Sequence, residues 1–292
     1  MAGPPRNPPD QRVLIIGSTS YVGRCLTEYA NRNGALVTAV SSTHCNLLDT
    51  ASACAFFGAL DRGTAYDLVL LSVVNKDVAN DYASYLDNVR MARNFMQAVS
   101  GAGARIKSVT YVSSVDVYGR RPALPLTENS QIAPDTWYGL AKYCCEWMLK
   151  TSGEIPCPTT VLRIPGIYGR GHRDRSVIGR FVRSMQDSRR VAISGSGQTL
   201  RDYTYVEDLC RLILQVIALR PGAIVNVASG ASRAVVEIAK LVGAVLGQEF
   251  EIVPGEEDTE RDFDLVFDNQ GLRTLLPDFR FTELRRGIES YL

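Results

Sequence analysis

Residues 12–40 constrain the fold of this chain more than any other segment. An apolar, β-branched run at 12–16 is followed by a glycine turn and by a helical stretch at 24–32. Asn33-Gly34 ends that helix, and a second apolar run covers 35–40. Strands as apolar as these are typical of a parallel sheet that is covered on both faces. The segment therefore predicts a βαβ unit.

The alternation of strands and helices continues along the chain, which predicts an α/β fold with a Rossmann-type, doubly wound parallel sheet. Sheets of this kind bind ligands beyond the carboxyl ends of their strands, where the glycine turn, Ser72 and Ser114 fall. Further strands are expected at 67–72, 108–113, 159–163 and 225–227, and further helices at 51–60, 82–100, 138–151 and 232–246.

A change of texture after Arg163, where loops rich in Gly and Arg begin, indicates a second and smaller part of the molecule. We expect a disordered, proline-rich tail at 1–10 and a dinucleotide-binding Rossmann domain at 11–164, rejoined by about 203–229. The smaller C-terminal substrate-binding domain is then formed by 165–202 and 230–292.

Composition narrows the range of partners. The chain has 292 residues, of which 46% are hydrophobic and 22% charged, and its net charge is +1. Because the basic residues are scattered, neither nucleic acid nor an anionic membrane is an expected partner. No apolar run is long enough for a signal peptide or a membrane span, so we expect a soluble, cytoplasmic protein.

The cysteines and histidines give no metal-binding pattern. Seven cysteines lie without a CxxC spacing, and the only histidines are His44 and His172. A structural zinc site is therefore not expected. Several of the cysteines fall in apolar segments, where a reduced thiol behaves as a small hydrophobic side chain.

The glycine turn after the first strand predicts a phosphate site. Gly17, Ser20 and Gly23 occupy the three glycine positions of a GxxGxxG turn. Backbone amides at the following helix N-terminus would cradle a pyrophosphate, and the Ser20 hydroxyl is a candidate donor to it. A helix N-terminus that binds no ligand is the alternative. The expected cofactor residues of this turn are Gly17, Thr19, Ser20, Tyr21, Val22 and Gly23.

A YxxxK motif suggests a redox site. Tyr138 and Lys142 form the motif, and Ser114 lies 24 residues before the tyrosine. Residues four apart share one face of a helix, so the ammonium can lower the phenol pKa. The serine hydroxyl can then share the substrate oxygen. A chance match in an ordinary helix is the alternative.

Further motifs follow in a specific order, and together they define a resemblance. They are Ser113-Ser114 running through Val117-Tyr118-Gly119, the LRIPGIYG stretch at 162–169, Gly195-Ser196-Gly197 and the RDYTYVEDL stretch at 201–209. With them the chain resembles, over almost its whole length, an extended short-chain dehydrogenase/reductase of the NAD-dependent epimerase/dehydratase family. This resemblance implies that Ser114, Tyr138 and Lys142 are catalytic.

The resemblance also implies substrate contacts. Arg201, and more weakly Arg261, falls where the family places an arginine on the diphosphate of a nucleotide sugar. An ion pair of Arg201 with Asp202 or Glu207 is the alternative. Asp116 lies where the family's dehydratases and some epimerases put a proton-transferring side chain, and a capping role in the following turn is equally open. The expected substrate residues are Ser114, Asp116, Tyr138, Arg201 and Arg261.

The end of the second strand bears on the cofactor. NAD-specific relatives place an acidic residue near Ser41, whereas this chain has Ser41 and Ser42 there. A hydroxyl-rich end without negative charge tolerates a 2′-phosphate, with His44 or Arg24 as reinforcement, so NADP(H) is favoured over NAD(H). By resemblance, the other cofactor residues are Asn46 and Leu47 near the adenine, Ser72, Val73 and Val74, Tyr138 and Lys142, and Ile164.

The family resemblance implies an NAD(P)-dependent oxidoreductase that acts on a nucleotide-diphosphate sugar. The missing carboxylate after the second strand favours a reductase that draws on exchangeable NADPH. By analogy, its expected activity is that of a 4-ketoreductase of a 4-keto-6-deoxy sugar nucleotide. The alternative is a 4-epimerase or dehydratase with tightly bound NAD, although Val115 departs from the dehydratase pattern and Gly166 from the asparagine of sugar epimerases. A cofactor-sensing protein without activity is a third hypothesis. Since relatives often dimerise, we expect a homodimer.

Overall fold

The computed structural model describes residues 11–102, 105–120, 123–172, 176–255 and 263–292. The chain divides into two compact units. The first comprises the chain up to Val117, then 134–163 and 210–225, and the second comprises 118–133, 164–209 and 226–292. The tail predicted at 1–10 lies outside the described residues.

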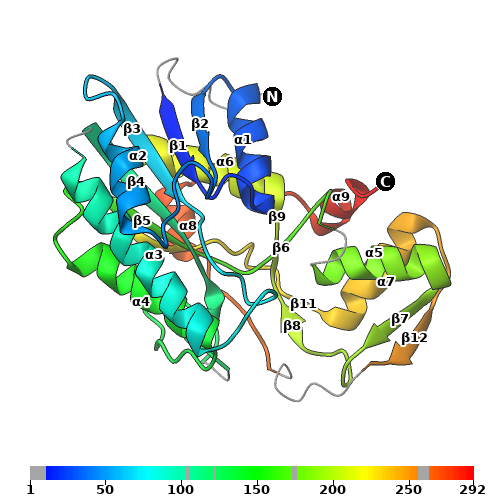
Figure 1. The fold of residues 1–292 in the computed structure, drawn as a ribbon. Helices are drawn as coiled ribbons and strands as arrows, with labels where there is room; N and C mark the ends of the chain where they lie inside the picture. Colours follow the sequence, from blue (N-terminus) through cyan, green and yellow to red (C-terminus); the bar gives the residue numbers. More distant parts are fainter. Residues whose placement is uncertain (1–10, 103–104, 121–122, 173–175, 256–262) are drawn as a thin grey trace. The chain divides into compact units, whose positions relative to one another are not determined.

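A six-stranded sheet forms the centre of the first unit, in the order β10-β5-β4-β3-β1-β2 (Figure 1). β1 pairs in parallel with both β2 and β3, and β3 pairs in parallel with β4. The strand order therefore reverses beside β1, which is where sheets of this type bind ligands. The strands are β1 (Arg12–Ile16), β2 (Leu36–Val40), β3 (Ala65–Leu70), β4 (Arg105–Ser114), β5 (Thr159–Ile164) and β10 (Ile224–Asn226), and the helices are α1 (Tyr21–Arg32), α2 (Thr50–Gly58), α3 (Tyr82–Gly101), α4 (Trp137–Thr151) and α6 (Val206–Leu219).

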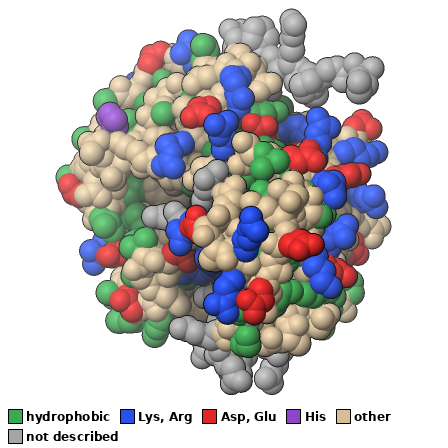
Figure 2. Space-filling model, turned by 90° about the vertical axis from the view of Figure 1, so that its right-hand side faces the viewer, with side chains coloured by type: hydrophobic (Ala, Val, Ile, Leu, Met, Phe, Trp, Pro, Cys, Tyr) green, Lys and Arg blue, Asp and Glu red, His purple; other side chains and the backbone are tan. Residues whose placement is uncertain are grey.

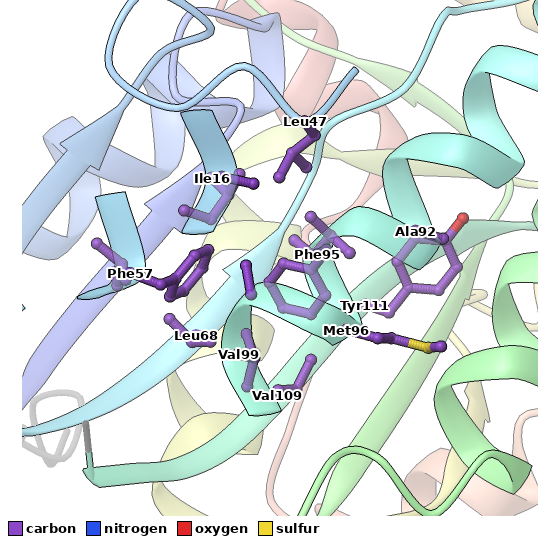
Figure 3. Packing of buried hydrophobic residues seen from close by; sticks show 14 of the residues in the cluster. Ile16, Leu47, Phe57, Leu68, Ala92, Phe95, Met96, Val99, Val109 and Tyr111 are labelled. Atoms are coloured by element: carbon purple, nitrogen blue, oxygen red, sulfur yellow. The ribbon is translucent and has the colours of Figure 1, made fainter. Parts of the chain in front are cut away.

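The main core of this unit lies between the sheet and α2, α3 and α4 (Figure 3). Ile16 and Leu68 of the sheet belong to the same cluster as Phe57 of α2 and Phe95 of α3. The two phenylalanine rings meet edge to face, with their centroids 5.7 Å apart. Both side chains are fully buried, which stabilises the fold by about 1.5–3 kcal/mol for each. All of β1 after Arg12 is buried, as expected for a strand covered on both faces.

The second unit has its own core and three two-stranded sheets. Tyr168, Phe181 and Met185 pack there with Ile238 and Val242. β6 (Gly166–Tyr168) pairs in parallel with β9 (Tyr203–Tyr205), and β7 (Arg190–Ile193) in parallel with β12 (Glu251–Pro254). The remaining elements are β8 (Leu200–Arg201), which is antiparallel to β11 (Arg233–Ala234), and the helices α5 (Val177–Ser188), α7 (Val235–Leu246), α8 (Gln270–Leu275) and α9 (Leu284–Glu289).

The predicted α/β fold with a doubly wound sheet is confirmed, but two details differ. Helix α1 begins at Tyr21 rather than near residue 24, because the Ser20 side chain caps it and accepts a hydrogen bond from Gly23 N. The predicted division of the chain also differs, since 118–133, 203–209 and 226–229 belong to the second unit. In 118–133, Tyr118 donates a hydrogen bond to Asn226 at 2.7 Å, and Leu126 forms a bridge with Phe267.

The surface shows no patch of a single charge on the face drawn in Figure 2, where Lys and Arg side chains are interspersed with Asp and Glu. This matches the net charge of +1. Among the described residues, no helix has the length and apolar character needed to cross a membrane.

Candidate active site

Two glycines bring β1, α1 and the end of β3 into close contact. Gly17 has φ +89°, and a Cβ there would lie 2.8 Å from Ser72 N. A Cβ on Gly23 would lie 2.4 Å from the Gly17 carbonyl oxygen. Only glycine fits either position without a shift of the backbone.

The turn between these glycines fits the pyrophosphate of a dinucleotide. Tyr21 and Val22 begin α1, so their amides belong to the first turn, whose N–H groups have no acceptor within the helix. The turn lies at the carboxyl end of β1, beside the reversal of strand order. Ser20, considered above as a phosphate donor, accepts from Gly23 N at 3.0 Å and so has a structural role as the N-cap.

The loop after β2 carries hydroxyl groups and an imidazole. The Ser41 Oγ lies 2.6 Å from Thr43 Oγ1 and 2.8 Å from His44 Nδ1. Ser42 and His44 are exposed. Arg24, exposed on α1, donates to the carbonyl of Thr19 at 2.6 Å.

The expected adenine segment is fixed by Asn46 within it and by Asn94 of α3. Asn46 Oδ1 accepts from Leu48 N at 3.1 Å, which closes a local turn. Leu47 is buried, and its carbonyl accepts from Asn94 Nδ2 at 2.7 Å. The Asn46 side chain is therefore already engaged within its own segment.

Several of the predicted cofactor residues meet around one small cavity of about 10 Å³ in the first unit. Leu47, Ser72, Val73 and Lys142 all line it. Asn88 lines it as well and fixes the backbone at Val74, because its Oδ1 accepts from Val74 N at 2.7 Å and its Nδ2 donates to Val74 O at 3.1 Å. Asn88 therefore has a structural role beside this cavity.

The YxxxK helix begins directly against the turn that carries Asp116. Thr136 caps α4 by accepting from Gly139 N at 3.0 Å. A Cβ on Gly139 would lie 2.5 Å from the Asp116 carbonyl oxygen, so this helix turn can approach only because residue 139 is glycine. Ser114 ends β4, and its hydroxyl forms a hydrogen bond with Tyr138. The structure thus brings Ser114 and Tyr138 together.

The Tyr138 phenol is kept protonated, which corrects one expectation. The YxxxK spacing predicts a lowered phenol pKa, whereas burial, together with the carboxylates of Asp116 and Asp77, raises the pKa of Tyr138 well above its ordinary value. The hydrogen bond from Ser114 lowers it only in part. Desolvation of the phenolate is the largest cause of this shift.

Lys142 lies beside Tyr138 and is buried, with 3% of its surface exposed. Its Nζ donates to the carbonyl of Val112 at 2.8 Å and lies 5.7 Å from the centroid of the Tyr138 ring. Burial lowers the pKa of Lys142 to about 8, although Cys145, Glu146 and Asp116 act in the opposite direction. The lysine therefore loses its charge as the pH rises through about 8, well below the ordinary range for a lysine.

A second lysine, which no sequence motif marks, also lies beside the tyrosine. Lys76 Nζ lies 5.6 Å from the centroid of the Tyr138 ring and 2.5 Å from Asp116 Oδ2. It follows β3 by a few residues and belongs to no motif. Only its closeness to Ser72 in the sequence could have indicated a place near the site. This indication is weak, because a loop can leave a strand in many directions.

A buried ion pair links helix α4 to strand β5. Arg163 of β5 and Glu146 of α4 are each 2% exposed, and Arg163 NH2 lies 2.7 Å from Glu146 Oε2. Ser113 donates a further hydrogen bond to Glu146. This network ties together β4, which carries Ser114, and α4, which carries Tyr138. Removal of one partner from such a buried pair typically costs about 3–5 kcal/mol.

The predicted substrate arginine lines a separate cavity within the second unit. This cavity has a volume of about 590 Å³, and Arg201 lies in its wall near Tyr203. Arg201 donates to the carbonyls of Leu200, at 2.9 Å, and Phe263, and Asp202 instead accepts from Ser229 and Gly230. Four further arginines line the cavity, namely Arg233, Arg273, Arg280 and Arg285, and Glu283 is the acidic residue of its wall.

The positions of three other predicted residues complete the description. Gly166 lies against Tyr203, since a Cβ there would be 2.8 Å from two carbons of that ring. An asparagine at this position would displace Tyr203. Ile164 is the last residue of β5, and Arg261 lies outside the described residues.

Among the described residues, no three His, Cys, Asp or Glu side chains gather as metal ligands.

Comparison with known proteins identifies the family. The model of the NAD dependent epimerase/dehydratase family matches residues 13–228, which is more than half of the chain. The chain belongs to this family, as the motifs indicated.

Individual relatives are more distant. dTDP-D-glucose 4,6-dehydratase from Homo sapiens is 30% identical over 139 residues, which cover 47% of this chain but only 40% of that protein. GDP-6-deoxy-D-talose 4-dehydrogenase from Aggregatibacter actinomycetemcomitans is 22% identical over 286 residues and 96% of each chain. The structure of RMD from Pseudomonas aeruginosa complexed with NADPH has the same fold, with a TM-score of 0.80 and 22% identity over 96% of this chain and 97% of that one.

Proposed function

We propose that this protein is an NADPH-dependent 4-ketoreductase of a 4-keto-6-deoxy nucleotide-diphosphate sugar. The observation that carries the proposal is the hydrogen-bonded pair of Ser114 and Tyr138 beside the buried Lys142. In this assignment Ser114 orients the substrate carbonyl, Tyr138 exchanges the proton at its oxygen, and Lys142 holds the nicotinamide ribose.

The protonation state of Tyr138 supports reduction as the direction of the reaction. Reduction of a ketone needs an acid that gives a proton to the carbonyl oxygen, whereas oxidation of an alcohol needs a base. The phenol of Tyr138 is kept protonated by burial and by two carboxylates, so it starts the cycle as an acid. The bound cofactor supplies the hydride.

NADPH is proposed because of the residues after β2. Residues 41–44 are Ser, Ser, Thr and His, so no carboxylate stands there to accept the ribose hydroxyls of NAD or to repel a 2′-phosphate. Exposed hydroxyls and an imidazole suit that phosphate. Arg24 is the candidate cation for it.

The cavity of the second unit supports a nucleotide diphosphate as part of the substrate. Five arginines line it against one glutamate, and the rings of Tyr203, Phe279 and Phe281 lie in its wall. Arginines recognise phosphate oxygens through paired N–H donors, and aromatic rings stack on a base. The full-length relative GDP-6-deoxy-D-talose 4-dehydrogenase is named for a substrate of this class.

Kinetics on arginine variants test this assignment. Arg201→Ala and Arg233→Ala are expected to raise KM for the nucleotide sugar by about tenfold or more and to leave the Kd for NADPH unchanged. Arg190→Ala is the matched control, because Arg190 is exposed and pairs with Glu251 outside the cavity. Equal changes of KM in all three variants would show that the cavity is not part of the substrate site.

A 4-epimerase or dehydratase with tightly bound NAD is the second candidate, and Asp116 favours it. Its carboxylate acts on the Tyr138 phenol, and its backbone N–H donates to Ser114 Oγ at 3.2 Å. A carboxylate there could take a proton from a carbon next to a ketone. Sugar nucleotides are therefore to be incubated with the purified protein, with and without NADPH. Turnover without added cofactor would exclude the reductase, and stoichiometric loss of NADPH would exclude the epimerase.

A cofactor-sensing protein without activity is the third candidate. It predicts that Tyr138→Phe leaves the function of the protein intact. Retention of Ser114, Tyr138 and Lys142 in one arrangement is the argument against it.

A homodimer in the cytoplasm completes the proposal. Tyr82 and Leu86 of α3 and Trp137 and Trp147 of α4 are each at least 40% exposed. Large apolar side chains on two neighbouring helices are typical of a protein interface. Sedimentation of the purified protein and fractionation of its native cells test the two statements.

A further inference from the structure

Lys76 is held in place by Asp116. The two side chains are 2.5 Å apart, and they are partly exposed, at 45% for the lysine and 24% for the aspartate. An exposed lysine on a loop normally samples many conformations. In the one that pairs with Asp116, its ammonium lies beside the Tyr138 ring, 5.6 Å from the centroid.

The charges around the Tyr138 phenol indicate what the Lys76–Asp116 pair does. Asp116 and Asp77 both oppose ionisation of Tyr138. The buried Lys142 loses its positive charge as the pH rises through about 8, because burial lowers its pKa. Lys76 is accessible to water, with 45% of its side chain exposed, and its ammonium pairs with the Asp116 carboxylate. It is therefore well placed to offset the charge of Asp116.

We propose that Lys76 is a positioning residue of this site, which holds the Asp116 carboxylate and makes the phenolate of Tyr138 less costly to form. The proposal deepens the proposed function and rests on Tyr138 being the proton donor of that reaction. Nothing in the motifs of the chain assigns a role to residue 76.

The proton step shows where the lysine acts. As the carbonyl carbon accepts the hydride from the reduced nicotinamide, the O–H bond of Tyr138 breaks and a new O–H bond forms on the substrate oxygen. Tyr138 is left as a phenolate and afterwards takes a proton back from water. Lys76 stabilises this phenolate, because a cation near a developing anion lowers its free energy.

Titration of the phenol itself tests the proposal without substrate or cofactor. A polyfluorinated tyrosine, whose phenol is acidic enough to ionise below the ordinary pKa range of lysine, is incorporated at position 138, and ¹⁹F NMR follows its ionisation while the protein stays folded. We expect Lys76→Met to raise the midpoint by about one unit, as Coulomb's law gives for a partly solvated charge 5–6 Å away. Lys76→Arg is expected to keep the wild-type midpoint. The charged and titratable groups that face the phenol, and that stay constant in this comparison, are Asp77, Asp116, Tyr111 and Lys142.

A double substitution tests whether Asp116 holds the lysine. In an Asp116→Asn background the lysine is no longer fixed beside the ring, so Lys76→Met is expected to shift the midpoint by less than half as much. An equal shift in both backgrounds would refute the pairing. Lys240→Met, at an exposed position of α7, is the control and is expected to shift nothing.

A midpoint that stays within about 0.2 unit in Lys76→Met would overturn the proposal, since the expected electrostatic effect is several times larger. Lys76→Gln replaces the methionine variant if that variant does not fold. Because the titration uses no sugar nucleotide, an error in the proposed substrate leaves this result interpretable.

Discussion

Tyr138 is the residue on which the proposed chemistry depends most. Tyr138→Phe removes the hydroxyl and keeps the ring, so we expect kcat to fall by about 10²–10⁴-fold with little change in the Kd for the dinucleotide. Tyr143→Phe, at the next tyrosine of the same helix, is the matched control. Steady-state kinetics and calorimetry provide the two measurements. A variant that keeps more than a tenth of wild-type turnover would contradict the role of Tyr138.

The buried Lys142 predicts a dependence of stability on pH. Its pKa is lowered from 10.5 to about 8 in the folded protein, so between these values the unfolded chain binds the additional proton. Stability contributed by this residue therefore rises as the pH rises through that window. We expect the free energy of unfolding, relative to Lys142→Met, to increase by about 3 kcal/mol from pH 8 to 10.5. Urea denaturation at several pH values measures the difference, and a constant difference would rule the effect out.

A substitution at Ser41 tests whether the protein prefers NADPH to NADH. Ser41→Asp places a carboxylate directly after β2, where it would repel a 2′-phosphate and accept hydrogen bonds from ribose hydroxyls. We expect the Kd for NADPH to rise at least tenfold, or by about 1.4 kcal/mol, and the Kd for NADH to fall. Ser41→Ala is the control, with a smaller change for both cofactors. An unchanged ratio of the two constants would show that this loop does not select the cofactor.

Residues were predictable where a local rule determines them. Tyr138 and Lys142 share a helix face through their spacing, and the glycine turn follows from backbone sterics. Lys76 was not predictable, because its place beside Tyr138 depends on a loop and on a partner 40 residues away in sequence. The direction of the Tyr138 pKa shift was predicted wrongly, since burial is a property of the folded protein.

At the scale of elements, the approach of α4 to the turn after β4 decides whether the site forms. Gly139→Ala places a Cβ 2.5 Å from the Asp116 carbonyl oxygen, so the first turn of α4 must move away. We expect a loss of about 1–3 kcal/mol in stability, and a fall of more than tenfold in kcat, because Tyr138 is the adjacent residue. Thermal unfolding and kinetics measure the two effects.

Gly58→Ala is the control for that substitution. Gly58 ends α2, and nothing lies within 4 Å of the Cβ that alanine would add. Alanine there is expected to be neutral or to stabilise by up to about 1 kcal/mol. If Gly139→Ala behaved like Gly58→Ala, the close approach of α4 would have no functional importance.

The order of the elements was predictable, whereas some of their ends were not. Apolar runs placed β1, β2 and α3 closely, because periodicity and burial act locally. Helix α1 begins earlier than predicted, since Ser20 acts as its cap rather than as part of an extended turn. Capping depends on the conformation of one residue, which the sequence alone leaves open.

At the scale of the whole molecule, the division into two units was only partly predictable. Residues 118–133 lie inside the first domain in sequence but belong to the second unit, where Glu128 accepts a hydrogen bond from Asn226 N at 2.8 Å. Contacts across about a hundred residues cannot be read from local patterns.

The proposed dimer is also a statement about the whole molecule. Trp147 is 59% exposed on α4, so Trp147→Glu is expected to convert a dimer into a monomer, because a buried unpaired carboxylate disfavours the interface. Leu219→Glu, at a comparably exposed position ending α6, is the control and is expected to leave the dimer intact. Sedimentation velocity distinguishes the two. A wild-type protein that sediments as a monomer would end the proposal.

The most direct test of the central claim is the stoichiometry of the reaction. Purified protein is mixed with NADPH and a 4-keto-6-deoxy sugar nucleotide, and the cofactor is followed by absorbance while the sugar is followed by mass spectrometry. The account predicts one NADPH oxidised for each sugar nucleotide that gains two hydrogens, and none in Tyr138→Phe. Conversion of the sugar nucleotide without any consumption of NADPH would contradict it.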